Sequence, residues 1–152
     1  GTNSISKVME MDEKTKILLV RAIYGTGVVL DALFALEMTL ITVFGESFAV
    51  YTLPEKTVSD LSYRYAMGIA ATMMWGWTVL LIWGAQDPLE RRGILFLTAF
   101  PVITGLMLSN VFAASKSLIS SRSGLLRPII FIALFAMFTS GYFLANDAQK
   151  RD

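Results

Sequence analysis

Residues 17–44 read ILLVRAIYGTGVVLDALFALEMTLITVF, a run that is apolar enough to cross a membrane. As one helix this run would be ~42 Å long, which exceeds the ~30 Å hydrocarbon core of a bilayer. Asp31 lies near its midpoint, where an ionised carboxylate is most costly, and Glu37 follows six residues later. The run therefore predicts a membrane-spanning helix that carries two acids which a plain anchor would not need.

The composition of the whole chain agrees with a membrane protein. Of 152 residues, 55% are hydrophobic and only 16% are charged, and the apolar residues fall in long runs. The net charge of +1 gives no signal for binding to nucleic acid. The apolar runs make the lipid bilayer the expected partner. The chain has no cysteine and no histidine, which removes disulfides, thiolate nucleophiles, the common zinc sites and histidine-ligated haem. We therefore predict no cofactor, no metal site and no catalytic residue.

The apolar runs predict an all-α membrane protein whose four transmembrane helices form an up-down-up-down bundle. Pro101 lies inside the third span and predicts a kink there. Single-domain organisation is expected over the full chain. The predicted spans are about 17–44, 65–85, 93–114 and 125–145.

The polar segment before the first span is expected to lie at the membrane surface. Ile5, Val8 and Met9 stand at helical spacing in it, which allows a short interfacial N-terminal helix. The acids in this segment and the length of the following apolar run argue against a cleaved signal peptide.

The distribution of Lys and Arg predicts the orientation of the bundle. With four spans, both termini lie on one side, which collects eight Lys and Arg against five on the other, so both termini are expected in the cytoplasm. The eight are Lys7, Lys14, Lys16, Arg21, Arg91, Arg92, Lys150 and Arg151, and the five are Lys56, Arg64, Lys116, Arg122 and Arg127.

Matching depths between spans predicts a polar cluster in the outer half of the bundle. Glu37 and Asn110 lie at similar depths, because their spans run the same way. Arg64 and Arg127 lie at the outer ends of the second and fourth spans and can reach inwards, with Tyr63 nearby.

Asp31 is predicted to lie deeper than this cluster and apart from it. Tyr24, seven residues earlier, shares its helical face. An intramembrane acid usually faces a cavity or a partner, so Asp31 is the strongest functional candidate. The alternative is a protonated side chain bonded to a threonine, such as Thr104 or Thr72, or to a carbonyl. If one acid is purely structural, we expect it to be Glu37.

Small residues recur every four positions in two of the predicted spans. Gly68, Thr72 and Gly76 form one stripe, and Gly105, Ser109 and Ala113 form a second. Such stripes let helices approach closely, and they make a homo-oligomer plausible.

One stretch of the chain is similar to a known transporter family. Four spans with an acid near the middle of the first resemble the small multidrug resistance transporters, and in residues 23–39 Asp31 falls where their coupling glutamate stands. The Gly-rich third helix of that family is missing here, and a charged turn, DPLERR at 87–92, joins the second and third spans. That turn is similar in layout to DoxX-like membrane proteins. Neither likeness includes a diagnostic motif, so the sequence assigns no family.

Together these features predict a small integral membrane protein that binds or transports a small or lipophilic ligand through an intramembrane cavity with acidic residues. The alternative is a structural or assembly subunit whose acids only specify helix pairing. A third hypothesis is an intramembrane enzyme that acts on lipid, with Asp31 or Glu37 as acid or base. The candidate ligand-binding or proton-coupling residues are Asp31, Glu37, Asn110, Tyr24, Arg64 and Arg127.

Overall fold

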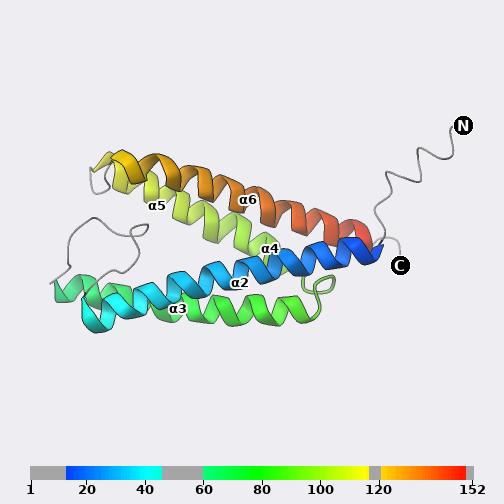
Figure 1. The fold of residues 1–152 in the computed structure, drawn as a ribbon, viewed down its shortest axis with the longest axis horizontal. Helices are drawn as coiled ribbons and strands as arrows, with labels where there is room; N and C mark the ends of the chain where they lie inside the picture. The colour runs from blue at the N-terminus through cyan, green and yellow to red at the C-terminus, as the bar shows by residue number, and fades with distance from the viewer. Residues whose placement is uncertain (1–12, 46–59, 117–120, 150–152) are drawn as a thin grey trace, which may run out of the picture.

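The computed structural model describes residues 13–45, 60–116 and 121–149, and in these residues it contains helices and turns without a strand (Figure 1). The predicted interfacial helix around Ile5, Val8 and Met9 lies outside the described residues. The helices are α2 (Glu13–Phe44), α3 (Leu61–Gln86), α4 (Gly93–Leu97), the π-helical turn η1 (Thr98–Ile103), α5 (Thr104–Ser115) and α6 (Ser121–Gln149).

The prediction of four membrane-spanning helices is confirmed at the level of length and composition. Four helical segments are long and apolar enough to cross a membrane, with α4, η1 and α5 together forming the third. The third span matches its predicted bounds to within one residue. The α2 and α3 helices each begin four residues earlier than predicted, and α6 extends four residues beyond its predicted bounds at each end. The fold therefore suggests a multi-pass membrane protein.

Pro101 lies inside η1, where the helix is wider than an α-helix. Proline has no backbone N–H, so the carbonyl one turn earlier loses its helical donor. After the turn, the backbone N–H of Thr104 bonds to the Ala99 carbonyl, five residues back, and the Thr104 hydroxyl lies 3.3 Å from the same oxygen. The irregularity predicted at this proline therefore takes the form of a π-helical turn.

The helices form two pairs. In the first, Arg64 near the start of α3 bonds to the carbonyl of Thr42 near the end of α2, and the Tyr24 hydroxyl reaches the turn that follows α3. These contacts show that α2 and α3 run in opposite directions, side by side, as Figure 1 also shows.

The second pair consists of α6 and the three-part span opposite it. Aromatic rings meet between them: the centroids of Phe96 and Tyr142 are 5.5 Å apart, and those of Phe100 and Phe135 are 5.4 Å apart. Phe96 comes before Phe100 in the third span, whereas its partner Tyr142 comes after Phe135 in α6. These two segments therefore also run in opposite directions. The α2 and α6 helices contact each other and connect the two pairs.

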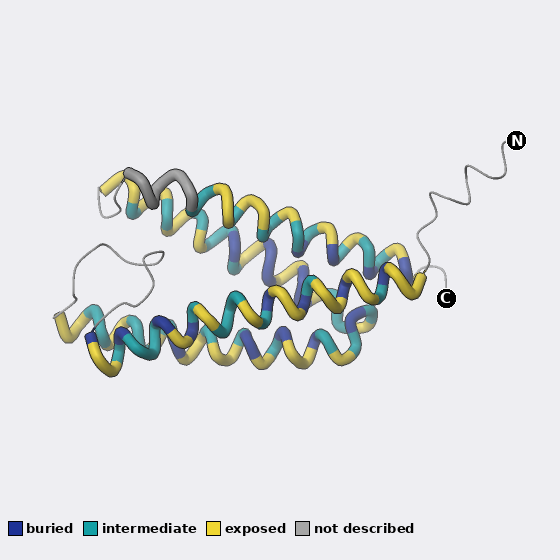
Figure 2. Tube along the Cα trace, in the orientation of Figure 1, coloured by how far each residue is buried: buried dark blue, intermediate teal, exposed yellow. Residues whose placement is uncertain are grey.

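The buried core joins the two helix pairs near one end of the bundle, where α2 begins and α6 ends. Lys16 in α2 and Asp147 in α6 form an ion pair at this end. In contrast, α5 contains no buried residue, as its yellow and teal colouring in Figure 2 shows. The core cluster consists of Val20, Tyr24, Leu81, Ile94, Leu95, Ala99, Ile103, Phe138 and Ala145.

The outward faces of the helices are strongly apolar. Leu18, Met73 and Val111 each leave about two thirds or more of their surface exposed, at 68%, 71% and 67%. Such a surface would be unfavourable in water, but lipid tails cover it without cost. The exterior of the bundle is therefore matched to a bilayer.

Candidate functional site

Threonine hydroxyls form a repeated contact between the helices of this bundle. Thr39 donates to a carbonyl one turn earlier in its own helix and accepts from Trp75 Nε1 at 3.1 Å. Thr98 likewise donates to its own helix and accepts from Trp77 Nε1 at 3.2 Å. In each case the hydroxyl proton is used within the helix, and the oxygen lone pair is available to a donor on the neighbouring helix.

A third threonine, Thr78, contacts Asp31 across the helices, with the carboxyl group of Asp31 in the place of the tryptophan side chain. Thr78 in α3 is buried, and its hydroxyl oxygen lies 3.0 Å from the Met74 carbonyl oxygen and 2.6 Å from Asp31 Oδ2. One hydroxyl proton can serve only one of these acceptors. Both contacts are hydrogen bonds when Asp31 is protonated and donates to Thr78, so the geometry fits a neutral carboxylic acid.

The threonine beside Asp31 is therefore Thr78 of α3, and not Thr72 or Thr104, the two examples named from the sequence. Thr72 donates to the Gly68 carbonyl one turn earlier, and Thr104 to the Ala99 carbonyl. The prediction of a threonine partner is correct in kind, but it is wrong in the residue.

A substitution of Thr78 tests this assignment of the proton. Thr78→Val should lower the free energy of unfolding by about 1–2 kcal/mol, because it leaves the Asp31 carboxyl without its acceptor. Asp31→Asn should keep the wild-type value, because the amide retains an N–H donor of similar shape. The measurement is unfolding by a denaturing detergent, followed by circular dichroism. A loss in Asp31→Asn as large as that in Thr78→Val would contradict the neutral-acid geometry.

Tyr24 and Arg64, both predicted site residues, make contacts within the bundle. Tyr24 is fully buried in the core, and its hydroxyl donates to the Arg91 carbonyl at 2.8 Å. The Arg64 guanidinium donates to the Thr42 and Val43 carbonyls, at 2.8 and 2.6 Å from Nη2. Carbonyls at the end of a helix lack helical donors, so Arg64 stabilises the end of α2.

Glu37 lies with two residues of the predicted outer cluster. Glu37 is buried, with 7% of its surface exposed, and its charge acts on Arg127 of α6 and on Tyr63 in the first turn of α3. The predicted outer cluster stays a prediction as a whole, because Arg64 donates to the carbonyls at the end of α2.

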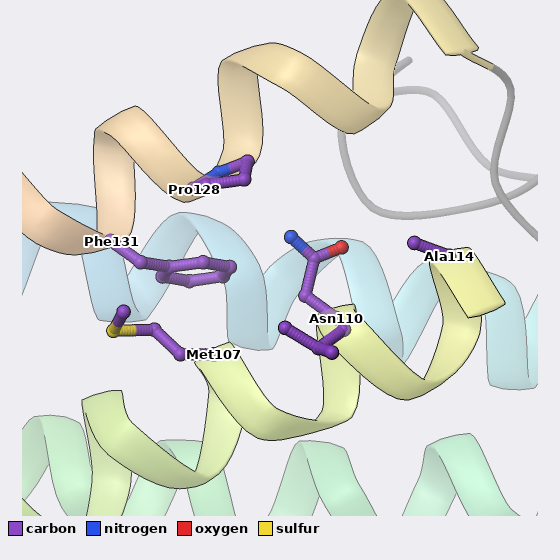
Figure 3. Close-up of a pocket in the computed structure, with 6 residues that line it drawn as sticks. Met107, Asn110, Ala114, Pro128 and Phe131 are labelled. Atoms are coloured by element: carbon purple, nitrogen blue, oxygen red, sulfur yellow. The ribbon is translucent and has the colours of Figure 1, made fainter.

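Asn110 lies in a pocket of about 170 Å³ between α5 and α6 (Figure 3). Its side chain points from α5 towards α6, between Phe131 and Ala114. The pocket is otherwise lined by apolar groups, namely Met107, Val111, Ala114, Pro128 and Phe131.

Two of the predicted site residues carry buried polar atoms that lack hydrogen-bond partners in the described part of the chain. These atoms are Oδ1 of Asn110 and both Nε and Nη2 of Arg127. A buried polar group without a partner costs on the order of 1–3 kcal/mol, and more in a lipid environment. Asn110 lines the pocket from α5, and Arg127 directly precedes Pro128 of the pocket wall in α6.

The polar groups of Asn110 and Arg127 can form hydrogen bonds, and Arg127 also carries a charge. Within residues 13–45, 60–116 and 121–149, no group of three or more acidic side chains could hold a metal ion. No family model, curated protein or solved structure matches this chain. The function must therefore be inferred from the contacts of its own residues.

Proposed function

We propose that this chain is a small multi-pass membrane protein that binds a small or lipophilic ligand inside the bilayer. In this proposal the four helices cross the membrane up-down-up-down, and both termini lie in the cytoplasm, where Lys and Arg are more frequent. The ligand site is the pocket between α5 and α6, in the outer half, with Glu37 as its nearby acid.

The observation that carries this proposal is the set of unsatisfied polar atoms on Asn110 and Arg127. A membrane helix that buries such atoms without partners loses stability, so their presence beside a pocket is typical of a binding site. A ligand that supplies the missing acceptor and donor would remove this cost. The apolar walls formed by Met107 and Phe131 favour a ligand with an apolar part.

The other predicted site residues receive a supporting role in this proposal. Asp31, Tyr24 and Arg64 all direct polar atoms at groups of the bundle itself. They hold α2 against α3 and thereby fix the position of Glu37. The structural acid of the pair would then be Asp31, which reverses the expectation drawn from the sequence.

A second function is favoured by the small residues on the outer faces. A Cβ added at Gly76 of α3 or at Gly105 of α5 would meet no other atom within 4 Å. Close approach of another membrane helix at either position is therefore sterically allowed. This supports the alternative of an assembly subunit or a homo-oligomer, which chemical cross-linking in native membranes would detect.

Filling the pocket tests the binding proposal. Met107 lines the pocket and is half-buried, so Met107→Trp should fill it, whereas Val79→Trp adds bulk to an exposed position on α3. In native mass spectrometry from a mild detergent, the wild type and Val79→Trp should carry a discrete additional mass that Met107→Trp lacks. A wild-type protein without any bound species, or a species retained by Met107→Trp, would contradict the proposal.

A further inference from the structure

Arg127 points to the chemical class of the ligand. It lies in the first half of α6, one turn before Phe131 and on the same helical face. Phe131 lines the pocket between α5 and α6. Arg127 itself does not line the pocket, but on this face it lies one turn beyond the Phe131 wall, at the end where a polar head would enter and an apolar tail would follow.

The two unpartnered nitrogens of Arg127 favour a particular acceptor. Nε and Nη2 lie on one edge of the planar guanidinium, and their N–H bonds are parallel. Two such donors match two oxygens on one carbon or phosphorus atom, as in a carboxylate or a phosphodiester. A single hydroxyl or carbonyl oxygen could satisfy only one of them well.

The charges at this end of the described helices favour a monoanion. Arg127 and Glu37 offset each other, and Arg64 adds a further positive charge that is bonded only to carbonyls. The formal sum of Arg127, Arg64 and Glu37 is +1, so a head with one negative charge would make this group of three side chains neutral. Neutrality is strongly favoured where lipid surrounds the site.

Asn110 provides the remaining polar contact of the head. Its Oδ1 is an unpartnered acceptor, and its amide also carries two N–H donors. In Figure 3 the amide stands in the pocket opposite Pro128, the neighbour of Arg127. A head held by Arg127 would thus meet a second hydrogen-bonding group on the facing helix.

The size of the pocket indicates how the rest of the ligand lies. A volume of about 170 Å³ is well below the ~300–1,000 Å³ of sites that enclose a whole ligand. It has room for a head and the first part of a chain. The walls formed by Met107, Val111 and Phe131 lead to the exposed apolar surface of α5, where an acyl tail would continue in the bilayer.

From these contacts we propose that the site binds a monoanionic amphiphile, whose two-oxygen head is held by the Nε–Nη2 edge of Arg127 and whose tail lies along Met107 and Phe131. The inference rests on the proposed function and adds the class of ligand. A fatty acid and an anionic phosphodiester lipid share this chemistry.

The test uses two photoreactive probes with the same 16-carbon chain and the same diazirine, one ending in a carboxylate and one in an alcohol. The full chain is reconstituted in nanodiscs of zwitterionic phosphatidylcholine, at a pH that ionises the carboxyl group. The half-saturating mole fraction of each probe is measured, and labelled residues are mapped by peptide mass spectrometry. Labels of the carboxylate probe are expected at Met107, Val111 or Phe131, with half-saturation about 10- to 100-fold lower than for the alcohol.

Variants of Arg127 separate the charge from the paired donors. Arg127→Gln should raise the half-saturating fraction of the carboxylate to that of the alcohol, and Arg127→Lys should restore it only in part. Arg21→Gln, an exposed arginine at the opposite end of α2, should behave like the wild type. Unlabelled phosphatidylglycerol should displace the carboxylate if the natural head is a phosphodiester, and should leave it bound if the head is a carboxylate.

Two outcomes would overturn the inference in different ways. Equal labelling of the pocket by the two probes, or wild-type binding in Arg127→Gln, would remove the anionic class but leave a lipophilic ligand site in place. Labelling outside the pocket by both probes would overturn the proposed function together with the ligand class. The comparison of the probes on the wild type needs no substitution, so it stands even if a variant does not fold.

Discussion

Gly84→Ala should lower the free energy of unfolding by about 3 kcal/mol, at the upper end of the usual cost of overpacking a core. A Cβ at Gly84 would lie 2.5 Å from Cε1 and 2.9 Å from Cζ of Tyr24, and 3.0 Å from Ile94 Cδ1. Tyr24 cannot move aside easily, because its ring is fully buried and its hydroxyl is bonded to the Arg91 carbonyl. The added methyl group must therefore displace either the ring or the whole of α3.

The same helix offers a matched control for this substitution. Gly76 lies eight residues earlier in α3, and a Cβ there would meet nothing within 4 Å. Gly76→Ala should leave the unfolding midpoint in detergent unchanged, as judged by circular dichroism or tryptophan fluorescence. Equal stability of the two variants would show that Tyr24 does not pack on Gly84 as described. Loss of stability in Gly76→Ala alone would instead indicate that α3 packs against another chain there.

The fold could be predicted from the sequence to the level of its helices, because long apolar runs between polar segments have few alternatives in a bilayer. The form of the third span could not. Pro101 indicates an irregularity, but whether a helix bends or widens there depends on which donors replace the missing N–H. Here the Thr104 backbone and hydroxyl both reach the Ala99 carbonyl, a contact that only the folded helix determines.

The candidate site could be predicted where depth alone matters. Glu37 is placed by its depth in the first span, and Arg127 by its position at the outer end of the fourth, and in the structure the charge of Glu37 acts on Arg127. The partner of Asp31 depends also on how each helix is rotated about its axis, which apolar runs that are hydrophobic on all sides do not reveal. Thr78 was therefore missed, although it forms the same kind of contact as Thr39 and Thr98.

The buried polar atoms of Asn110 and Arg127 that lack hydrogen-bond partners could not be predicted either. Whether a side chain finds a partner depends on which groups the neighbouring helices place around it. The sequence predicts Asn110 in the outer polar cluster, and the structure places its oxygen in a pocket without a partner among the described residues. The sequence gives its depth and its chemistry, while only the packing of α5 on α6 shows that it faces a pocket. That difference separates a residue that fixes helix packing from one available to a ligand.

Gly27→Ala should disturb the junction between the two helix pairs, with an expected loss of about 2 kcal/mol in unfolding free energy. A Cβ at Gly27 of α2 would lie 2.6 Å from Cζ and 3.1 Å from Cε1 of Phe138 in α6. Phe138 is only 3% exposed and belongs to the core cluster, so its ring has little room to turn. Gly25→Ala, two residues earlier with nothing within 4 Å, is the matched control and should retain wild-type stability.

A second substitution shows whether the loss comes from this one contact. Phe138→Leu removes the ring atoms that a Cβ at Gly27 would meet, so Gly27→Ala should cost less in that background than in the wild type. The expected coupling between the two positions is about 1 kcal/mol, within the range found for residues in contact. Additive losses would mean that α2 and α6 are not held together through this contact. Because Glu37 and Arg127 also come from α2 and α6, a weakened junction should in addition reduce binding of the carboxylate probe.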